Sequence, residues 1–163
     1  MNTMYVLDAS VIIKWFSEEE YTDIALKLRD DFFRGYTELV VPDLLLYEVS
    51  NALRYNPNFD ETDVIEAVDS LYDIGISIIV PTGVVIKSAI NLAFTHNVTI
   101  YDAFYAAVAK AIDFTLITAD AKFYRKMTSL DFVKIHRRDR CCPQQSVSSP
   151  QFSRIYLCWF IAL

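Results

Sequence analysis

Four acidic residues, Asp8, Glu48, Asp102 and Asp120, occupy positions from which their side chains could act together. Asp8 and Asp120 closely follow short apolar segments, and Glu48 and Asp102 lie on the apolar faces of expected helices. A carboxylate is costly to bury unless it is paired or binds a metal ion. Convergence of four such groups would therefore favour divalent cations, which indicates metal-assisted chemistry on phosphate esters.

Each of these acids also has a purely structural explanation. Asp8 and Asp120 could cap the helices that follow them, and Asp102 could stabilise its helix from the first turn. Glu48 could extend along its helix to reach solvent. Capping explains one acid at a time, whereas all four lie on the strand-end side of one expected sheet. We therefore interpret all four as candidate catalytic metal ligands, with Asp120 completing a second site.

The expected ligand atoms are oxygens, which favour the hard cations Mg²⁺ or Mn²⁺. The two histidines, His96 and His136, are isolated in the sequence, so we expect them at the surface or at helix ends. The three cysteines all lie in the C-terminal tail, which leaves the body without a thiol ligand. Two cations could activate a water and stabilise the departing oxygen of a phosphodiester. Ser10 and Thr118 are candidate supporting residues, because their hydroxyls could bond a carboxylate, a phosphate or the backbone.

The distribution of charge limits how a substrate is held. The 163 residues carry a formal net charge of −6, and the tail after position 136 is basic, so the body is strongly acidic. An acidic surface binds nucleic acid poorly, because contacts to phosphates supply most non-specific affinity. A nucleic-acid substrate would then be held by bound metal, by a partner or by local basic residues, for which Lys14 and Lys122 are candidates.

Composition and termini indicate the class of protein and its compartment. Hydrophobic residues make up 53% and charged residues 22%, which is typical of a globular domain. No apolar run is long enough to span a membrane, and the N-terminus lacks a basic region followed by a long apolar run. We therefore expect a cytoplasmic protein, which the cysteine-free body also favours.

Short apolar strands alternate with amphipathic helices along residues 1–136. Strands are expected over 5–7, 39–41, 76–80, 114–118 and 132–135, and helices over 9–16, 18–33, 42–55, 61–74, 84–96, 102–112 and just after 120. Pro42 is expected to open its helix and Asp60 to cap the next one, while the strand over 76–80 is expected to be buried. The alternation predicts an α/β fold, a three-layer α/β/α sandwich with a mostly parallel central sheet. Ligands of such sheets bind at the carboxyl ends of the strands.

The tail over 137–163 differs in composition from the body. It has no usable periodicity until its last nine residues, which are all apolar. These could dock on the body, form a dimer contact, or belong to an extension without function. We favour the last explanation, and we expect one domain over residues 1–136 followed by a non-domain tail.

Four segments together resemble PIN-domain ribonucleases. They are Val-Leu-Asp-Ala-Ser at 6–10, Pro-Asp-Leu-Leu-Leu-Tyr-Glu-Val-Ser-Asn-Ala-Leu at 42–53, Tyr-Asp-Ala-Phe-Tyr-Ala-Ala-Val-Ala at 101–109, and Leu-Ile-Thr-Ala-Asp at 116–120. They occur in the order and spacing of the family, over about residues 4–136, and the nearest subgroup is the VapC-type toxins of toxin–antitoxin pairs.

The resemblance implies a metal-dependent endoribonuclease that hydrolyses RNA phosphodiesters. It also implies a homodimer that a small antitoxin protein inhibits. Carried onto this sequence, the family's acidic residues correspond to Asp8, Glu48, Asp102 and Asp120, and its supporting polar residues to Ser10 and Thr118.

Two other functions remain open at this point. A haloacid-dehalogenase-like phosphatase would use Asp8 as a covalent nucleophile, but it would want a second aspartate where Ser10 stands. A non-catalytic protein-interaction module could instead use the acids to hold one structural metal ion.

Overall fold

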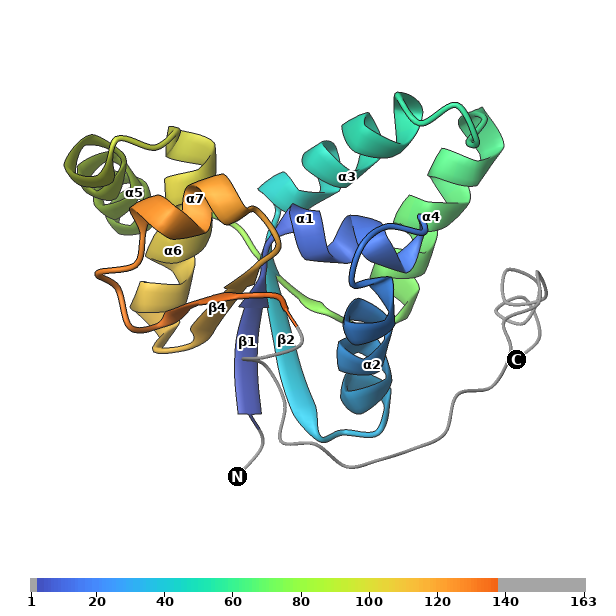
Figure 1. Cartoon of the computed structure of the whole chain (residues 1–163), viewed down its shortest axis with the longest axis horizontal. Helices are drawn as coiled ribbons and strands as arrows, with labels where there is room; N and C mark the ends of the chain where they lie inside the picture. Colours follow the sequence, from blue (N-terminus) through green and yellow to red (C-terminus); the bar gives the residue numbers. More distant parts are fainter. Residues whose placement is uncertain (1–2, 138–163) are drawn as a thin grey trace.

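The computed structural model describes residues 3–137, which form an all-parallel sheet between two layers of helices (Figure 1). The strands are β1 (Thr3–Leu7), β2 (Thr37–Pro42), β3 (Ser77–Ile79), β4 (Thr115–Thr118) and β5 (Val133–Ile135). Their order in the sheet is β3-β2-β1-β4-β5. The chain adds β2 and β3 on one side of β1, and then adds β4 and β5 on the other side. The boundary between β1 and β4 is therefore the switch point of the sheet, where the strand order changes direction. This confirms the predicted α/β/α sandwich.

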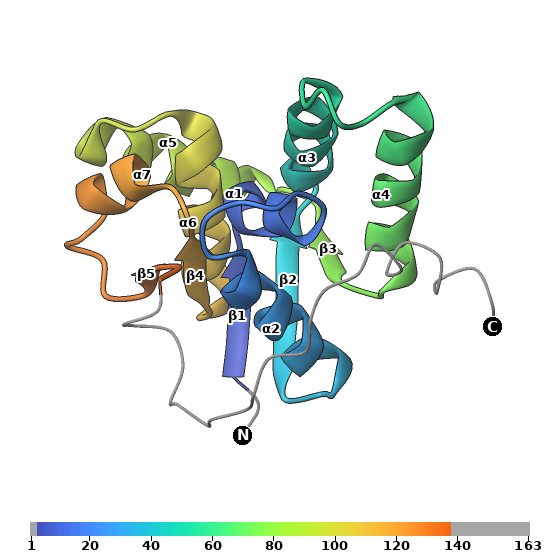
Figure 2. The ribbon, with the colours of Figure 1, turned by 45° about the vertical axis from the view of Figure 1, so that its right-hand side comes forward.

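The helices divide between the two faces of the sheet as right-handed crossovers require (Figures 1 and 2). One layer holds α2 (Thr22–Phe33), α3 (Leu44–Arg54) and α4 (Glu61–Asp73), and the other holds α5 (Gly83–His96), α6 (Ile100–Ile112) and α7 (Ala121–Lys126). The short helix α1 (Ala9–Ile12) leaves the end of β1 and continues into the 3₁₀ turn η1 (Ile13–Trp15). The carboxyl edge of the sheet is thus covered by α1 and flanked by one helix layer on each side.

The centre of the fold is formed by β1, β4 and α6. Val6, Leu7 and Leu116 are fully buried, as expected for central parallel strands that are covered on both faces. Every residue of α6 from Ala103 to Ala109 is also buried, and this helix contacts β1, β2, β4 and α5. The alanines of α6 allow that close approach, because they add little bulk between the helix and its neighbours.

Three of the differences between expected and observed element boundaries have a clear physical reason. Pro42 ends β2, where it pairs in register with Ile79, and α3 starts only at Leu44 after the cap residue Asp43. Residues 18–21 belong to a loop rather than to α2, because Tyr21 has a φ of 66° that interrupts the helix. The strand expected over 76–80 shortens to β3, which is partly exposed because it lies at the edge of the sheet.

The expected cap of the helix after Asp60 is confirmed. The Asp60 carboxylate accepts the Asp63 N–H at 3.0 Å, and the Asp63 carboxylate accepts the Asp60 N–H at 2.9 Å, so a capping box starts α4. Gly75 follows α4 with a φ of 73°, a conformation that favours glycine. Within residues 3–137, no helix is both long and apolar enough to cross a membrane. The tail after 137, with its three candidate explanations, lies outside the described residues.

Candidate active site

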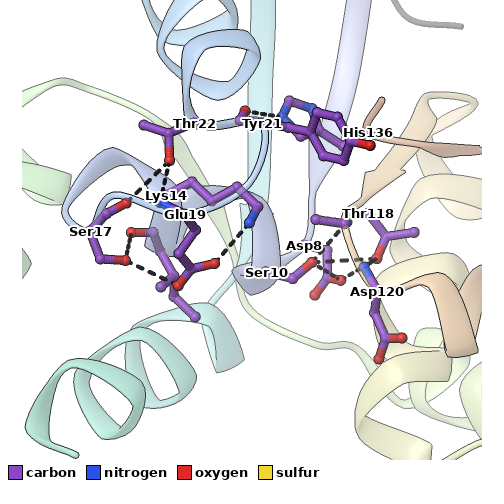
Figure 3. A network of polar contacts seen from close by, with 12 residues as sticks. Asp8, Ser10, Lys14, Ser17, Glu19, Tyr21, Thr22, Thr118, Asp120 and His136 are labelled. Carbon is purple, nitrogen blue, oxygen red and sulfur yellow. Dashed lines mark hydrogen bonds and ion pairs between the residues drawn. The ribbon is translucent and has the colours of Figure 1, made fainter. Parts of the chain in front are cut away.

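Asp8 is held at the switch point by two hydroxyl groups (Figure 3). It directly follows β1, and its N–H donates to the Ile117 carbonyl of β4 at 3.0 Å, which extends the strand pairing by one step. Its Oδ2 atom accepts hydrogen bonds from Ser10 Oγ at 2.7 Å and from Thr118 Oγ1 at 2.5 Å. The Asp8 carboxylate is therefore fixed both by the helix that follows it and by the neighbouring strand.

The two hydroxyls are themselves anchored by the loop after β4. The Ala119 N–H donates to Ser10 Oγ at 2.9 Å, and the Asp120 N–H donates to Thr118 Oγ1 at 3.0 Å. Each hydroxyl accepts from the backbone and donates to Asp8, so its single proton is directed at the carboxylate. Of the three partners predicted for Ser10 and Thr118, the structure shows two together: a carboxylate and the backbone.

Glu48 reaches the same edge of the sheet from the second turn of α3, where it is partly buried. Its Oε2 atom accepts a hydrogen bond from the hydroxyl of Tyr105, which lies on α6 in the opposite helix layer. Tyr105 was not among the site residues predicted from the sequence. A signal was available, because Tyr105 lies three residues after Asp102 and so on the same face of α6.

Asp102 lies in the first turn of α6, and its N–H is capped by Thr99 Oγ1 at 3.0 Å. A carboxylate at this position stabilises the helix dipole, so the structural explanation of Asp102 holds. Helix stabilisation alone does not explain why Asp102 lies near two other acids. Its charge raises the pKa of both Asp8 and Glu48.

The carboxyl groups of Asp8, Glu48 and Asp102 thus form a trio that lies close enough for mutual repulsion. Burial raises the pKa of Asp8 above its usual value and the Asp102 charge adds to this, while the Thr118 hydroxyl opposes it. Burial likewise raises the pKa of Glu48, and the charges of Asp8 and Asp102 add to it, while the Tyr105 hydroxyl opposes it. Three acids from three separate elements therefore share one electronegative site.

Asp120 is connected to this trio but also serves as a helix cap. Its Oδ1 atom accepts the Lys122 N–H at 2.6 Å and the Phe123 N–H at 3.1 Å, which starts α7. The side chain is exposed, and the connection to Asp8 runs through the Thr118 hydroxyl. The capping explanation considered for Asp120 is therefore correct for one of its two carboxylate oxygens.

The chemistry of the trio suits a hard divalent cation, since its donors are carboxylate oxygens whose charges are not cancelled by the hydroxyls around them. Within residues 3–137, however, no three Asp, Glu, His or Cys side chains are already arranged to hold one ion together. Cation binding would therefore have to draw the carboxylates closer, against a repulsion that the cation itself removes.

Two other residues differ from the sequence-based expectations. Lys14 is 8% exposed, and its Nζ atom pairs with Glu19 Oε2 at 2.8 Å, so it is neither a free phosphate contact nor a solvated charge (Figure 3). His136 is 1% exposed rather than at the surface, and its Nε2 atom lies 3.2 Å from the Tyr21 carbonyl. His96 does lie at a helix end, as expected, in the last turn of α5.

Comparison with known proteins identifies a family and relatives for this chain. Residues 5–127 match the PIN domain family. The chain is 31% identical to Ribonuclease VapC3 of Pyrobaculum aerophilum over 129 residues, which cover 77% of this chain and 95% of the relative.

Two solved structures illustrate the shared fold. A toxin–antitoxin complex from Klebsiella pneumoniae has a TM-score of 0.62 and 14% identity, over 82% of this chain and 98% of that one. VapC20 of Mycobacterium tuberculosis, a toxin that cleaves the sarcin–ricin loop, has a TM-score of 0.61 and 14% identity. The match covers 74% of this chain and 93% of that one.

The sheet is parallel and carries an acidic site at its switch point. The protein is therefore of the class of α/β domains that have carboxylates at the ends of their strands. Together with the match over residues 5–127 and the 31% identity to a curated relative, this arrangement identifies the family. The chain belongs to the PIN-domain family.

Proposed function

We propose that this protein is a metal-dependent endoribonuclease that hydrolyses RNA phosphodiesters, and that it is the toxin of a toxin–antitoxin pair. The observation that carries the proposal is the trio of mutually repelling carboxylates, Asp8, Glu48 and Asp102, at the switch point of a PIN-domain sheet. The relative at 31% identity is named a ribonuclease, and a structural neighbour is a toxin that cleaves RNA, which supports the assignment.

In this proposal the trio holds Mg²⁺ or Mn²⁺, and Asp120 completes a second site with the carboxylate oxygen that does not cap α7. When bound, the cation lowers the pKa of a water and offsets charge on the phosphodiester. The residues of the chain orient the ligands: Ser10 and Thr118 fix Asp8 from two sides. Since both are neutral donors, they add no positive charge that would compete with the cation for Asp8.

The raised pKa values of Asp8 and Glu48 support the same function. Burial and repulsion favour protonation of these carboxyls when no cation is present. A divalent cation supplies positive charge in place of those protons. Cation binding would therefore relieve an unfavourable arrangement of charge at this site.

The remaining parts of the proposal concern partners and context. Structural neighbours from toxin–antitoxin complexes support a small antitoxin protein as partner. That the assembly is a homodimer is part of the proposal, and it follows from the resemblance of the sequence to VapC-type toxins. We place the protein in the cytoplasm, where its RNA substrate and antitoxin would be found. We assign the whole activity to residues 1–136, because the trio, Asp120 and both supporting hydroxyls lie within them.

The test is cleavage of an end-labelled RNA pool with and without Mn²⁺ or Mg²⁺, comparing the wild type with Asp102→Asn. The matched control is Asp113→Asn, at the other end of α6, where a φ of 59° suits asparagine. We expect metal-dependent cleavage that Asp102→Asn abolishes and Asp113→Asn retains.

Three results would contradict the proposal. They are full activity in well-folded Asp102→Asn, activity in EDTA equal to that with Mn²⁺, and tight Mn²⁺ binding by calorimetry without cleavage of any RNA offered. The last result would favour the non-catalytic interaction module. Accumulation of a phospho-aspartate at Asp8 would instead favour the phosphatase.

A further inference from the structure

Tyr105 is a core residue whose only polar atom is directed at the site. It is 1% exposed, within the run of α6 that is buried from Ala103 to Ala109. A buried phenol requires a hydrogen-bond partner, because an unpaired hydroxyl in the interior is unfavourable. Tyr105 finds that partner in Glu48, on a helix 57 residues earlier in the chain. The contact joins the α3 layer to the α6 layer across the carboxyl edge of the sheet.

Glu48 depends on this contact for its orientation. A glutamate side chain has three rotatable bonds, and Glu48 is partly exposed, so it could also turn toward solvent. Within residues 3–137, the hydroxyl of Tyr105 is the one hydrogen-bond donor that the structure gives to the Glu48 carboxylate. It engages Oε2, and no donor among the described residues reaches Oε1.

The type of donor is also informative. Elsewhere this chain also holds an acid with a cation, as in the ion pair of Lys14 and Glu19. At Glu48 it uses a neutral phenol, which fixes the carboxylate without cancelling its charge. An ammonium or guanidinium at the same place would compete with any metal ion for Glu48.

We propose that Tyr105 is a positioning residue, which acts through its hydrogen bond to Glu48 to present the charged carboxylate to a divalent cation. This inference rests on the proposed function, since it takes Glu48 as a metal ligand. Tyr105 and Asp102, one turn apart on α6, then serve the site in two ways: Asp102 as a ligand, and Tyr105 as the support of a ligand on another helix.

The inference predicts a specific effect of Tyr105→Phe. The aromatic ring, which fills the core, is retained, and the hydroxyl alone is lost. Removal of a group that orients a metal ligand typically weakens metal affinity about 10–100-fold. We expect that loss in Mn²⁺ affinity of the RNA-free protein, measured by calorimetry, together with a kcat at saturating Mn²⁺ that stays within about threefold of wild type. A general structural defect would not separate the two quantities in this way.

A second variant breaks the same hydrogen bond from the other side without touching the core. Glu48→Asp keeps a carboxylate but shortens the side chain, so that it no longer reaches Tyr105. If Tyr105 acts through Glu48, adding Tyr105→Phe to Glu48→Asp should change Mn²⁺ affinity by less than about twofold, because coupled residues are not additive. Tyr72→Phe, which removes an exposed hydroxyl on α4, is the control and should match the wild type.

The outcomes separate the two proposals. Wild-type Mn²⁺ affinity in Tyr105→Phe, or an equal loss from this change in the wild-type and Glu48→Asp backgrounds, would overturn the role of Tyr105 alone. Absence of Mn²⁺ binding and of RNA cleavage in the wild type would instead overturn the proposed function. If Tyr105→Phe does not fold, Glu48→Asp still decides, since an Mn²⁺ affinity equal to that of the wild type would show that the hydrogen bond is dispensable.

Discussion

Thr118, the last residue of β4, donates its hydroxyl to Oδ2 of Asp8, the first residue after β1, at 2.5 Å. The two residues stand at the ends of neighbouring strands on either side of the switch point. Thr118 is fully buried and accepts the Asp120 N–H in turn, so a single side chain connects two of the four predicted acids. The position of Asp8 therefore depends on the pairing of β1 with β4 as well as on its own loop.

Thr118→Val is expected to destabilise the fold. The substitution keeps the shape of the side chain but leaves the Asp120 N–H without an acceptor and takes one donor from Asp8. Loss of a buried hydrogen-bond partner costs about 1–3 kcal/mol. Urea unfolding should show this loss, while Thr115→Val, at the other end of β4, should change stability far less. Equal effects of the two variants would contradict the prediction.

The ion pair of Lys14 and Glu19 predicts an asymmetry between its two partners. Glu19→Gln leaves a buried ammonium unpaired, which we expect to cost about 1–3 kcal/mol. Lys14→Met removes the buried charge itself and should cost less, and the double variant should be more stable than Glu19→Gln alone. Urea unfolding measures all three proteins, with Glu18→Gln as the exposed control. A larger loss from Lys14→Met than from Glu19→Gln would refute this account.

His136 predicts a dependence of stability on pH. Its Nε2–H donates to the Tyr21 carbonyl, and burial lowers the pKa of the imidazole below its usual value, so the folded protein favours the neutral ring. The unfolded chain then binds the proton more readily. Stability should be complete above the ordinary histidine pKa, about 6.5, and should fall as the pH drops through the lowered value.

This dependence is measured by urea unfolding between pH 5 and 8. In His136→Gln the part of the acid-induced loss that comes from His136 should vanish, whereas His96→Gln, at the partly exposed end of α5, should keep the wild-type profile. A wild-type profile that is unchanged by His136→Gln would exclude the imidazole as the cause.

Removal of residues 138–163 is expected to preserve both fold and activity. The sheet, both helix layers and every proposed site residue lie within residues 3–137. The truncated protein should unfold at the same temperature as the full chain and cleave the same RNA at the same rate. Insoluble or inactive truncated protein would mean that the tail is part of the domain.

The sequence was most informative where a signal was local. The apolar segments that became β1 and β4, and the Asp60 cap of α4, each depend on neighbouring residues, and they were predicted at the right places. The gathering of Asp8, Glu48 and Asp102 was also predictable, because the parallel topology brings strand ends to one edge.

What could not be predicted depends on contacts between distant segments. The role of the Tyr105 hydroxyl is set by a partner on α3, and the burial of Lys14 is possible only because Glu19 folds back onto it. Pro42 was assigned to a helix because its own preference fits a first turn, but pairing with β3 keeps it in the sheet. In each case tertiary structure decided between local options of similar free energy.

The position of β1 at the centre of the sheet has a consequence for synthesis on the ribosome. β1 is the first strand to emerge, yet its neighbour β4 is encoded about a hundred residues later, and Asp8 and Thr118 are separated by 110 positions. A nascent chain that already displays Asp8 lacks one of the two hydroxyls that hold it, that of Thr118, and the helix that carries Asp102 and Tyr105. The acidic site is thus completed only when nearly all of the domain has been translated, and we expect a partly made chain to lack ribonuclease activity.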